Sequence, residues 1–310
     1  MMGSSLCEVP GLRIGHAHDD AAQTGCTVIL PSRPAVAGVD VRGSAPGTRE
    51  IELLHPIRLV QEIHAIYLTG GSAFGLNGAG GVQRYLEERE IGFETGFAKV
   101  PIVPAAVIFD LGVGSATVRP DTEMAYRACQ QANDSEAREG LVGAGRGATV
   151  GKIRGMQHCM RGGVGMVSWR HGEVVVAALV VVNALGDIVD PKSGSIIAGA
   201  KDERGNFTDT CVFLKTHPFT PITPFSNTTL AVIATNARFN RSSLTKIAQM
   251  ANDGFARAIS PAHTFFDGDV VFMLSCGDET ADVTAIGVVA AELTATAIVR
   301  AVQVSNNLTA

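Results

Sequence analysis

The chain has 310 residues, of which 46% are apolar and 18% charged, and its formal net charge is −5. This composition excludes a wholly disordered chain, and no Lys/Arg run suggests a nucleic-acid-binding surface. The longest apolar run, residues 174–182, is far shorter than the roughly 20 residues that span a bilayer. We therefore expect a protein that binds neither nucleic acid nor membrane.

The cysteines and the start of the chain predict the compartment. No CxxC pair occurs, and the start lacks a basic region followed by an apolar core, so we expect no signal peptide. In a chain of this length, scattered cysteines are typical of reduced, mostly buried thiols in a cytoplasmic protein. The six cysteines are Cys7, Cys26, Cys129, Cys159, Cys211 and Cys276.

The first half of the chain alternates short apolar runs with helical patterns. Residues 48–66 repeat apolar side chains at helical spacing, with Thr48 as a possible N-cap and a break near Pro56. Asp121 is a plausible cap for a second helix. The remaining expected elements are strands at 27–30, 65–69 and 106–111 and helices at 82–90 and 121–139.

The second half has longer apolar strands. Residues 164–169 and 174–182 predict a hairpin whose second strand is covered on both faces. Residues 192–226 show little periodicity, and we expect a long loop there. The following elements are strands at 229–235 and 270–275 and helices at 238–259 and 280–302. Together they predict one α/β (α+β) domain, residues 1–310, with packed sheets covered by helices.

Two segments resemble ligand sites but have ordinary explanations as well. The glycine-rich stretch 70–81 follows a strand and precedes a helix, where backbone N–H groups can hold an anion, but its spacing matches no nucleotide-binding motif. A tight turn with close helix packing is the alternative. His16 and His18 resemble a metal-binding pair that lacks a third ligand, and a loop of solvated polar residues explains them better.

Five further positions carry side chains suited to catalysis. Asp267 and Asp269 flank one glycine directly before a strand, so they form either a turn or a carboxylate pair. Thr228 opens a buried strand. Lys152 is a lone lysine among glycines, and such a lysine is usually a solvated surface charge. Asn183 ends the apolar run, and a buried amide there must find partners as a core hydrogen bond or an oxyanion donor.

Taken together, these segments resemble the L-aminopeptidase/D-esterase (DmpA) family, which includes β-peptidyl aminopeptidases and the nylon-oligomer hydrolase. Each matching stretch is weak alone, but they occur in the family's order along the chain. The Asp-Gly-Asp form with a threonine is most similar to the nylon-oligomer hydrolase branch. The matching stretches are residues 68–76, 100–104, 147–152, 227–236 and 267–269.

The resemblance implies a four-layer αββα fold that is made as an inactive precursor. The precursor would cut itself between Asn227 and Thr228, giving chains 1–227 and 228–310 and making Thr228 the N-terminal nucleophile. It further implies a homotetramer of processed protomers, and a small peptide or amide as substrate.

The same resemblance assigns roles to single residues. Asp267 and Asp269 would orient and polarise the nucleophile, Lys152 would support it electrostatically, and Asn183 would help to form the oxyanion hole. Substrate contacts would come from Gly71, Ser72 and Phe109. Phe109 stands where several relatives have a tyrosine, and it cannot donate a hydrogen bond.

The chemistry fits a threonine at a new N-terminus. A threonine hydroxyl needs a neighbouring base, and a free α-amine with a pKa of about 7.7–8.0 can serve as one. Before cleavage that nitrogen is an amide and accepts no proton. We expect the acids to hold Thr228 and a substrate ammonium, with no metal and no cofactor.

Two other functions are compatible with the same residues. An acyltransferase of the ornithine acetyltransferase type would form the same acyl-enzyme and pass the acyl group to an amine. An uncleaved small-molecule-binding α/β protein would use the glycine-rich turn as its pocket.

Overall fold

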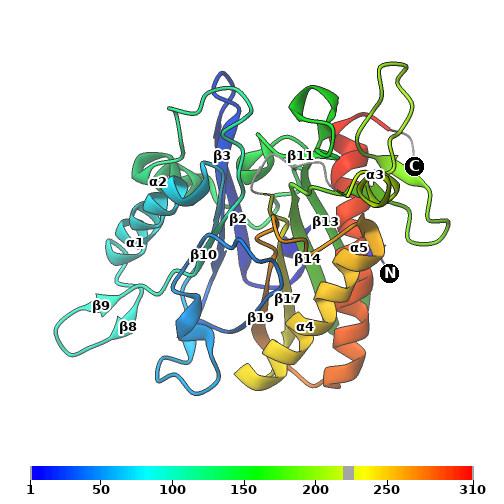
Figure 1. The fold of residues 1–310 in the computed structure, drawn as a ribbon. Helices are drawn as coiled ribbons and strands as arrows, with labels where there is room; N and C mark the ends of the chain where they lie inside the picture. The colour runs from blue at the N-terminus through cyan, green and yellow to red at the C-terminus, as the bar shows by residue number, and fades with distance from the viewer. Residues whose placement is uncertain (1, 219–226, 309–310) are drawn as a thin grey trace.

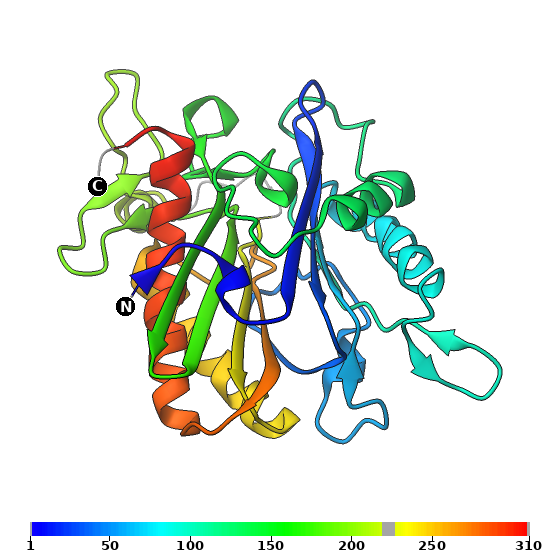
Figure 2. The same cartoon turned by 180° about the vertical axis from the view of Figure 1, so that it is seen from behind.

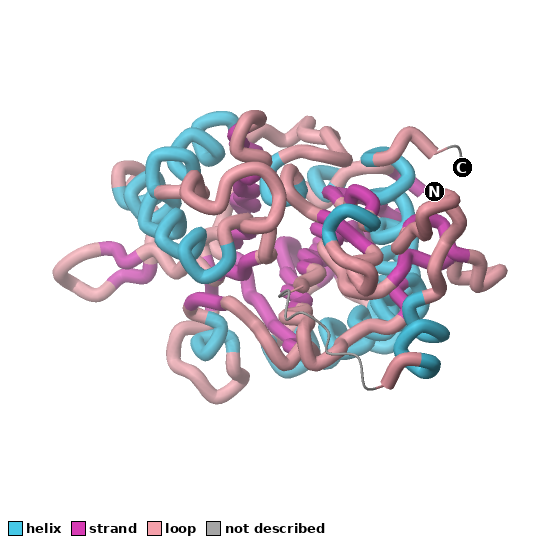
Figure 3. The backbone as a smooth tube through the Cα atoms, turned by 45° about the horizontal axis from the view of Figure 1, so that its top comes forward, coloured by secondary structure: helices cyan, strands magenta, loops and turns pink. Residues whose placement is uncertain are grey.

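Two β-sheets lie face to face between two pairs of helices (Figure 1). This arrangement comes from a computed structural model that describes residues 2–218 and 227–308. Figure 2 shows the same layers from behind, and Figure 3, with the top turned forward, shows helices on the flanks and strands between them. The expected four-layer αββα fold is confirmed.

The larger sheet has seven strands in the order β1-β13-β14-β17-β19-β4-β6. Its central strands are almost wholly buried and rich in Val, Ile and Ala, as expected for a sheet covered on both faces. The strands are β1 (Met2–Gly3), β4 (Ala35–Val41), β6 (Glu62–Ile63), β13 (Gly163–His171), β14 (Val174–Val182), β17 (Leu230–Ala237) and β19 (Val270–Glu279).

The smaller sheet has five strands in the order β2-β3-β7-β10-β5. They are β2 (Leu12–Asp19), β3 (Thr24–Pro31), β5 (Thr48–Arg49), β7 (Ile66–Thr69) and β10 (Ala105–Val107). The short sheets comprise β8 (Phe93–Glu94), β9 (Lys99–Val100), β11 (Thr149–Val150), β12 (Met160–Arg161), β15 (Asp187–Val189), β16 (Ile196–Ala198) and β18 (Ile259–Ser260).

Four of the five described α-helices begin at a side chain that caps their first turn, and α1 is the exception. Asp121 accepts a hydrogen bond from the Met124 N–H and so starts α2, while Asn240 and Asp282 do the same for α4 and α5. The α-helices are α1 (Ala79–Glu87), α2 (Thr122–Gln131), α3 (Thr210–Thr216), α4 (Arg241–Ala258) and α5 (Val283–Ser305). The 3₁₀ helices are η1 (Leu6–Glu8), η2 (Ile51–Leu54), η3 (Ser72–Gly78), η4 (Gly143–Gly145) and η5 (Met156–His158).

Three apolar layers hold the four structural layers together. One lies between α4, α5 and the outer face of the large sheet, and a second fills the space between the two sheets. The third lies between the small sheet and the helices α1 and α2. Phe255, Phe272 and Tyr67 are the largest fully buried side chains of these three layers, one in each.

The topology of the large sheet brings three chain segments to one edge. β17 and β19 are parallel neighbours, with Leu230 opposite Val270, so the residues just before both strands lie at the same end. β14 pairs antiparallel with β17, with Val181 opposite Leu230, so the residue after β14 arrives there too. The segments that meet are those around residues 183, 228 and 267–269.

The helix expected at residues 48–66 is wrong. That stretch forms β5, η2 and β6 instead, and Thr48 pairs with Ala106 in the small sheet rather than capping a helix. The buried guanidinium of Arg241 donates to carbonyls of this segment, those of Leu53, His55 and Val60. These long-range contacts outweigh the local apolar period, and Pro56 interrupts it further.

Other expected elements hold with different bounds. The hairpin of β13 and β14 is confirmed, and so are the strands and helices that follow residue 228. The helix expected at 121–139 ends at Gln131, and the one expected at 82–90 spans Ala79–Glu87. The predicted loop 192–226 contains β16 and α3, and its residues 219–226 lie outside the described part.

One described helix is long and apolar enough to cross a bilayer by length and composition alone. It is α5, and 61% of its most apolar window is buried inside the protein. Its residues Leu293, Ala297 and Ile298 belong to the apolar layer over the large sheet. We therefore treat α5 as a core helix.

Candidate active site

The Asn227–Thr228 peptide bond lies buried at the shared start of β17 and β19. Asn227 is 0% and Thr228 3% exposed. The Thr228 hydroxyl donates to the carbonyl oxygen of Asn227 at 2.6 Å, and the Gly268 N–H donates to that same oxygen at 2.7 Å. The Thr228 N–H donates to the Asn183 carbonyl at 2.9 Å. Both sides of this peptide bond are therefore held by hydrogen bonds.

The two aspartates take different partners. Asp269 accepts the Thr229 N–H at 2.7 Å with one oxygen, and its other oxygen is bonded to the His263 ring at 2.8 Å. Asp267 accepts from the N–H and the hydroxyl of Thr264, at 2.7 and 2.5 Å. The turn lies at residues 265–266, just before Asp267, so the turn expected at Asp-Gly-Asp itself is corrected, while the two carboxylates lie close enough to interact electrostatically.

Burial and mutual repulsion change the acidity of this pair. Burial first, and then the charge of Asp269, raise the pKa of Asp267 to about 6. Asp267 therefore keeps its proton to higher pH than an exposed aspartate does.

Lys152 is buried beside the same peptide bond, so the surface reading of this lysine is wrong. Its ammonium donates to the backbone oxygen of Asn183 at 3.2 Å and to the side-chain oxygen at 2.9 Å. Burial lowers the pKa of Lys152 to about 7, although the Cys159 thiol and the carboxylates of Asp267 and Asp110 act in the opposite direction. Lys152 and the Thr228 N–H share one acceptor, the Asn183 carbonyl.

Asn183 connects both sheets to the site. Its side-chain oxygen also accepts the Thr149 N–H at 3.1 Å, and its amide group donates to the Phe109 carbonyl at 3.1 Å. The buried amide is therefore a core hydrogen-bonding residue in the uncleaved chain. Phe109 enters the site through its backbone carbonyl.

Gly71 and Ser72 reach the site through the segment that carries Phe109. The Gly71 N–H donates to the buried carboxylate of Asp110 at 2.7 Å, and the Ser72 N–H donates to the Ile108 carbonyl at 3.0 Å. Both residues have positive φ, +80° and +54°, which for serine is a strained backbone conformation. This turn is built by close contacts and leads into η3, as a tight-turn reading requires.

Sequence reasoning missed two residues of the site, Gly268 and His263. In the sequence Gly268 is only the spacer between two acids, yet a Cβ there would lie 2.7 Å from the Thr228 hydroxyl. His263 lies four residues before Asp267, and a lone histidine in a loop gives no signal in the sequence. Its contact with Asp269 depends on the fold of residues 260–269.

The histidines near the N-terminus do not form a metal site in the described residues. His16 and His18 lie on β2, not in a solvated loop, and His16 is 1% exposed with its ring bonded to the Thr27 hydroxyl at 2.9 Å. No group of three potential metal-ligating side chains occurs in residues 2–218 and 227–308. The loop expected there is corrected to a strand.

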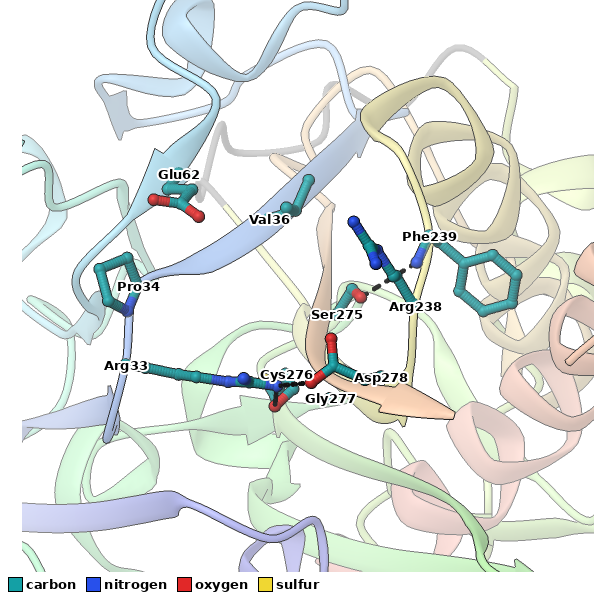
Figure 4. A pocket seen from close by; sticks show the side chains of 10 residues that line it. All are labelled: Arg33, Pro34, Val36, Glu62, Arg238, Phe239, Ser275, Cys276, Gly277 and Asp278. Carbon is teal, nitrogen blue, oxygen red and sulfur yellow. Dashed lines mark hydrogen bonds and ion pairs between the residues drawn. The ribbon is translucent and has the colours of Figure 1, made fainter. Parts of the chain in front are cut away.

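A separate cavity of about 250 Å³ lies at the other ends of β17 and β19 (Figure 4). Arg33 and Asp278 form an ion pair across it at 2.7 Å, and Ser275 accepts the Phe239 N–H at 3.1 Å. Along a strand of eight residues the rise is about 3.3 Å per residue, so this cavity lies far from Thr228. It holds none of the predicted site residues.

The sequence is similar to known proteins over nearly its whole length. The profile of Peptidase family S58 matches residues 4–310. A Mycobacterium tuberculosis protein named "Uncharacterized aminopeptidase" is 40% identical, with 96% of this chain and 93% of the relative covered. The 6-aminohexanoate-oligomer endohydrolase of Paenarthrobacter ureafaciens is 33% identical, with 95% and 84% covered.

Solved structures share the fold. A β-aminopeptidase from Burkholderia has a TM-score of 0.68 at 23% identity, with 96% of this chain and 86% of that one covered. The L-aminopeptidase D-Ala-esterase/amidase of Ochrobactrum anthropi, described as a variant of the Ntn hydrolase fold, has a TM-score of 0.71 at 16% identity, with 96% and 85% covered.

Proposed function

The chain belongs to peptidase family S58 and is a hydrolase of peptide or amide bonds, and we propose that Thr228 cuts first its own chain and then the substrate. One observation carries this proposal. The Thr228 hydroxyl lies against the carbonyl of the bond that precedes it, and the Gly268 N–H polarises that same carbonyl oxygen. The nucleophile, the electrophile and a donor for the developing oxyanion are already assembled.

The first step forms an ester. The Thr228 Oγ attacks the carbonyl carbon of Asn227, its proton passes to a neighbouring base, and the carbonyl oxygen gains negative charge. The Gly268 N–H donates to this oxygen. The C–N bond then breaks and the nitrogen of Thr228 takes up a proton, which leaves the Asn227 acyl group on Oγ and a free α-amine.

The second step releases the two chains. Water attacks the ester carbon, the C–O bond breaks, and Asn227 becomes a carboxylate while Thr228 regains its hydroxyl. The new amine takes the place of the N–H that donated to the Asn183 carbonyl. Lys152 donates to that same carbonyl oxygen, so its ammonium lies close to the new amine. While Lys152 carries its proton, its charge lowers the pKa of the Thr228 amine, so more of that amine is neutral and able to act as a base.

Turnover then repeats the chemistry on a substrate. The Thr228 amine takes the hydroxyl proton, Oγ attacks the amide carbon, the amine product leaves with a proton, and water hydrolyses the acyl-enzyme. Release of residue 227 from the site frees the Gly268 N–H for the substrate oxyanion. Loss of one such donor costs roughly 3 kcal/mol in other hydrolases.

We propose a short amide with a free ammonium group as the substrate class. The names of two relatives, an aminopeptidase and an endohydrolase of 6-aminohexanoate oligomers, both refer to amide bonds between amino-acid units, and the first also to a free amino end. Both carboxylate oxygens of Asp269 are already bonded within the protein, one to the Thr229 N–H and the other to the His263 ring. This favours Asp267 as the carboxylate that receives the substrate ammonium.

A substrate panel tests the proposal. Purified enzyme is incubated with linear 6-aminohexanoate dimer and trimer, with aminoacyl p-nitroanilides, and with the N-acetylated form of each. We expect the enzyme to hydrolyse the substrates that carry a free amino group and to be about 100-fold slower on their acetylated forms. We expect no hydrolysis by Thr228→Ala. Acetyl transfer from N-acetylornithine to glutamate without amide hydrolysis would favour the acyltransferase reading, and activity in Thr228→Ala would refute the proposed nucleophile.

A further inference from the structure

His263 holds an unusual conformation next to the acid pair. Its φ is +53°, in the left-handed region that costs a residue with a side chain about 1 kcal/mol or more. Its ring stacks on Phe255 of α4, with centroids 5.6 Å apart, and its Nδ1 lies 2.8 Å from Asp269 Oδ2. The backbone of Asn252, also in α4, is a further hydrogen-bond partner of the ring.

This ring fixes a carboxylate that in turn fixes the start of β17. Asp269 Oδ1 accepts the N–H of Thr229, the residue directly after the nucleophile. The Asp269 carbonyl accepts the Arg42 N–H at 3.1 Å, so the backbone of Asp269 is held as well. A rotation of the Asp269 carboxylate is therefore the motion that the ring of His263 prevents.

We propose that His263 is a positioning residue of the site, which locks the Asp269 carboxylate onto the Thr229 N–H and thereby keeps the Thr228 hydroxyl at the Asn227 carbonyl. The expected effect on the rate of self-cleavage rests on the proposed function. The expected effect on the Thr229 N–H does not. His263 touches no reacting atom, so it acts only through Asp269.

The surroundings of the ring favour its charged form. Burial lowers the pKa of His263, but the hydrogen bond and the charge of Asp269, with the Asn252 backbone and Asp267, raise it more, so the net direction is upward. The side chain of Asn252 donates to the carboxylate of Asp40, which in turn forms an ion pair with Arg42 at 2.6 Å.

The carboxylate of Asp187, on the strand paired with β18, accepts N–H groups of Ala200 and Thr210 and is thus occupied elsewhere. Asp269 is consequently the carboxylate that the ring pairs with directly.

The two aspartates differ in their surroundings. The ring of His263 is bonded to Asp269, and Asp269 also accepts the Thr229 N–H. Burial, and then the charge of Asp269, raise the pKa of Asp267 to about 6. Asp267 is therefore the carboxyl that exchanges a proton near neutral pH, and Asp269 is the fixed backbone acceptor.

Two substitutions separate the hydrogen bond from the backbone strain. Glycine and asparagine both tolerate positive φ. His263→Gly removes the donor, and His263→Asn keeps a neutral N–H donor close to the position of Nδ1. Phe255→Leu removes the stacked ring and leaves the donor in place, and it serves as the control for packing.

The first readout does not depend on cleavage. In the uncleaved Thr228→Ala chain, the amide proton of Thr229 is followed by NMR and hydrogen exchange. His263→Gly is expected to shift this resonance and speed its exchange about tenfold, as for loss of a charge-assisted hydrogen bond, while His263→Asn retains most of the protection. An unchanged Thr229 resonance and exchange rate in His263→Gly would overturn the proposal.

The second readout is the rate of self-cleavage against pH in the chain that keeps Thr228. We expect His263→Gly to slow cleavage about tenfold or more and to move its acid limb about one unit toward higher pH, because loss of a cation raises the pKa of nearby carboxyls. His263→Asn should recover rate at neutral pH but keep the shifted limb.

A wild-type rate and pH profile in His263→Gly would contradict the positioning role, whereas a wild-type chain that never splits would instead refute the proposed function.

Discussion

Gly268 illustrates how one missing side chain can carry chemistry. Its N–H donates to the Asn227 carbonyl, and a Cβ at this position would lie 2.5 Å from the Ala45 carbonyl oxygen and 2.7 Å from the Thr228 hydroxyl. The segment after β4 closes over this backbone, since the Ala45 N–H donates to the Asp267 carbonyl at 2.9 Å. The spacer between the two aspartates is therefore required to be small.

We predict that Gly268→Ala slows self-cleavage about 100-fold or more, because the methyl group displaces the hydroxyl from the carbonyl that it attacks. The first-order disappearance of the full-length band measures this rate. Gly80→Ala in α1 is the control, since its nearest neighbour would be 3.5 Å away and alanine favours the helix. Equal cleavage rates in the two variants would show that Gly268 plays no part.

The acidities at the site predict the pH dependence of self-cleavage. Burial lowers the pKa of Lys152 to about 7 and raises the pKa of Asp267 to about 6, so both groups lose protons as pH rises from 5 to 8. Each deprotonation supplies a base within the site, and we expect one of these two groups to take up the Thr228 hydroxyl proton. We expect the rate constant of self-cleavage to rise about tenfold per pH unit at low pH and to level off near pH 8.

Asp267→Asn removes one of these acceptors while it keeps the size of the side chain. It should lower the plateau of the cleavage rate and simplify the limb to a single titration. A wild-type rate that is flat between pH 5 and 8 would contradict the assignment of an acceptor among these groups.

At the scale of elements, the site exists because two parallel strands start at one edge of a sheet. Strand periodicity predicts β17 and β19, and short polar segments precede both. Their parallel pairing, with Leu230 opposite Val270, is not visible in local sequence because α4 and β18 separate them. The family resemblance predicts that Thr228 and the two aspartates share one site, and the order of the strands in the sheet explains why they meet.

The failures of sequence reasoning also have a physical pattern. Residues 48–66 have a helical period, but their backbone carbonyls are taken by Arg241, which lies far away in sequence. His263 and Lys152 gained their roles through burial beside partners from other elements. Local pattern predicts element type well where a strand or helix is long, and it fails where a tertiary partner decides.

The contact between α4 and α5 offers a test of the packing itself. A Cβ on Gly254 would lie 2.4 Å from the Ala291 carbonyl oxygen of α5, a backbone atom that cannot give way alone. We predict that Gly254→Ala lowers the free energy of unfolding by about 1–3 kcal/mol despite the better helix propensity of alanine.

Urea unfolding of the Thr228→Ala chain, which stays in one piece, measures this change. Lys246→Ala on the exposed side of α4 is the control and should stay within about 0.5 kcal/mol of the parent. A Gly254→Ala chain as stable as its parent would show that the helices can separate at low cost.

At the scale of the molecule, the cut at residue 228 would divide the large sheet without unfolding it. Strands β13 and β14 belong to the first chain and β17 and β19 to the second, and β14 pairs with β17 over six residue pairs. The apolar layers on both faces of this sheet join residues from either side of the cut. The two chains should therefore remain one folded protomer.

The assembly and the compartment remain predictions. The described cysteines are all free thiols, although four of the six are only partly buried. Sedimentation velocity is expected to give a mass of four protomers. A monomer that hydrolyses amides would remove the homotetramer from this account and leave the chemistry of Thr228 intact.

The central claim is that Thr228 becomes active by cutting the chain in front of itself. Intact-mass spectrometry of freshly purified wild-type and Thr228→Ala protein tests it most directly, with N-terminal sequencing of any fragment. We predict two wild-type chains, the second starting at Thr228, and a single uncut Thr228→Ala chain. A Thr228→Ala chain that splits at the same bond, or an uncut wild-type chain that hydrolyses amides, would contradict the account.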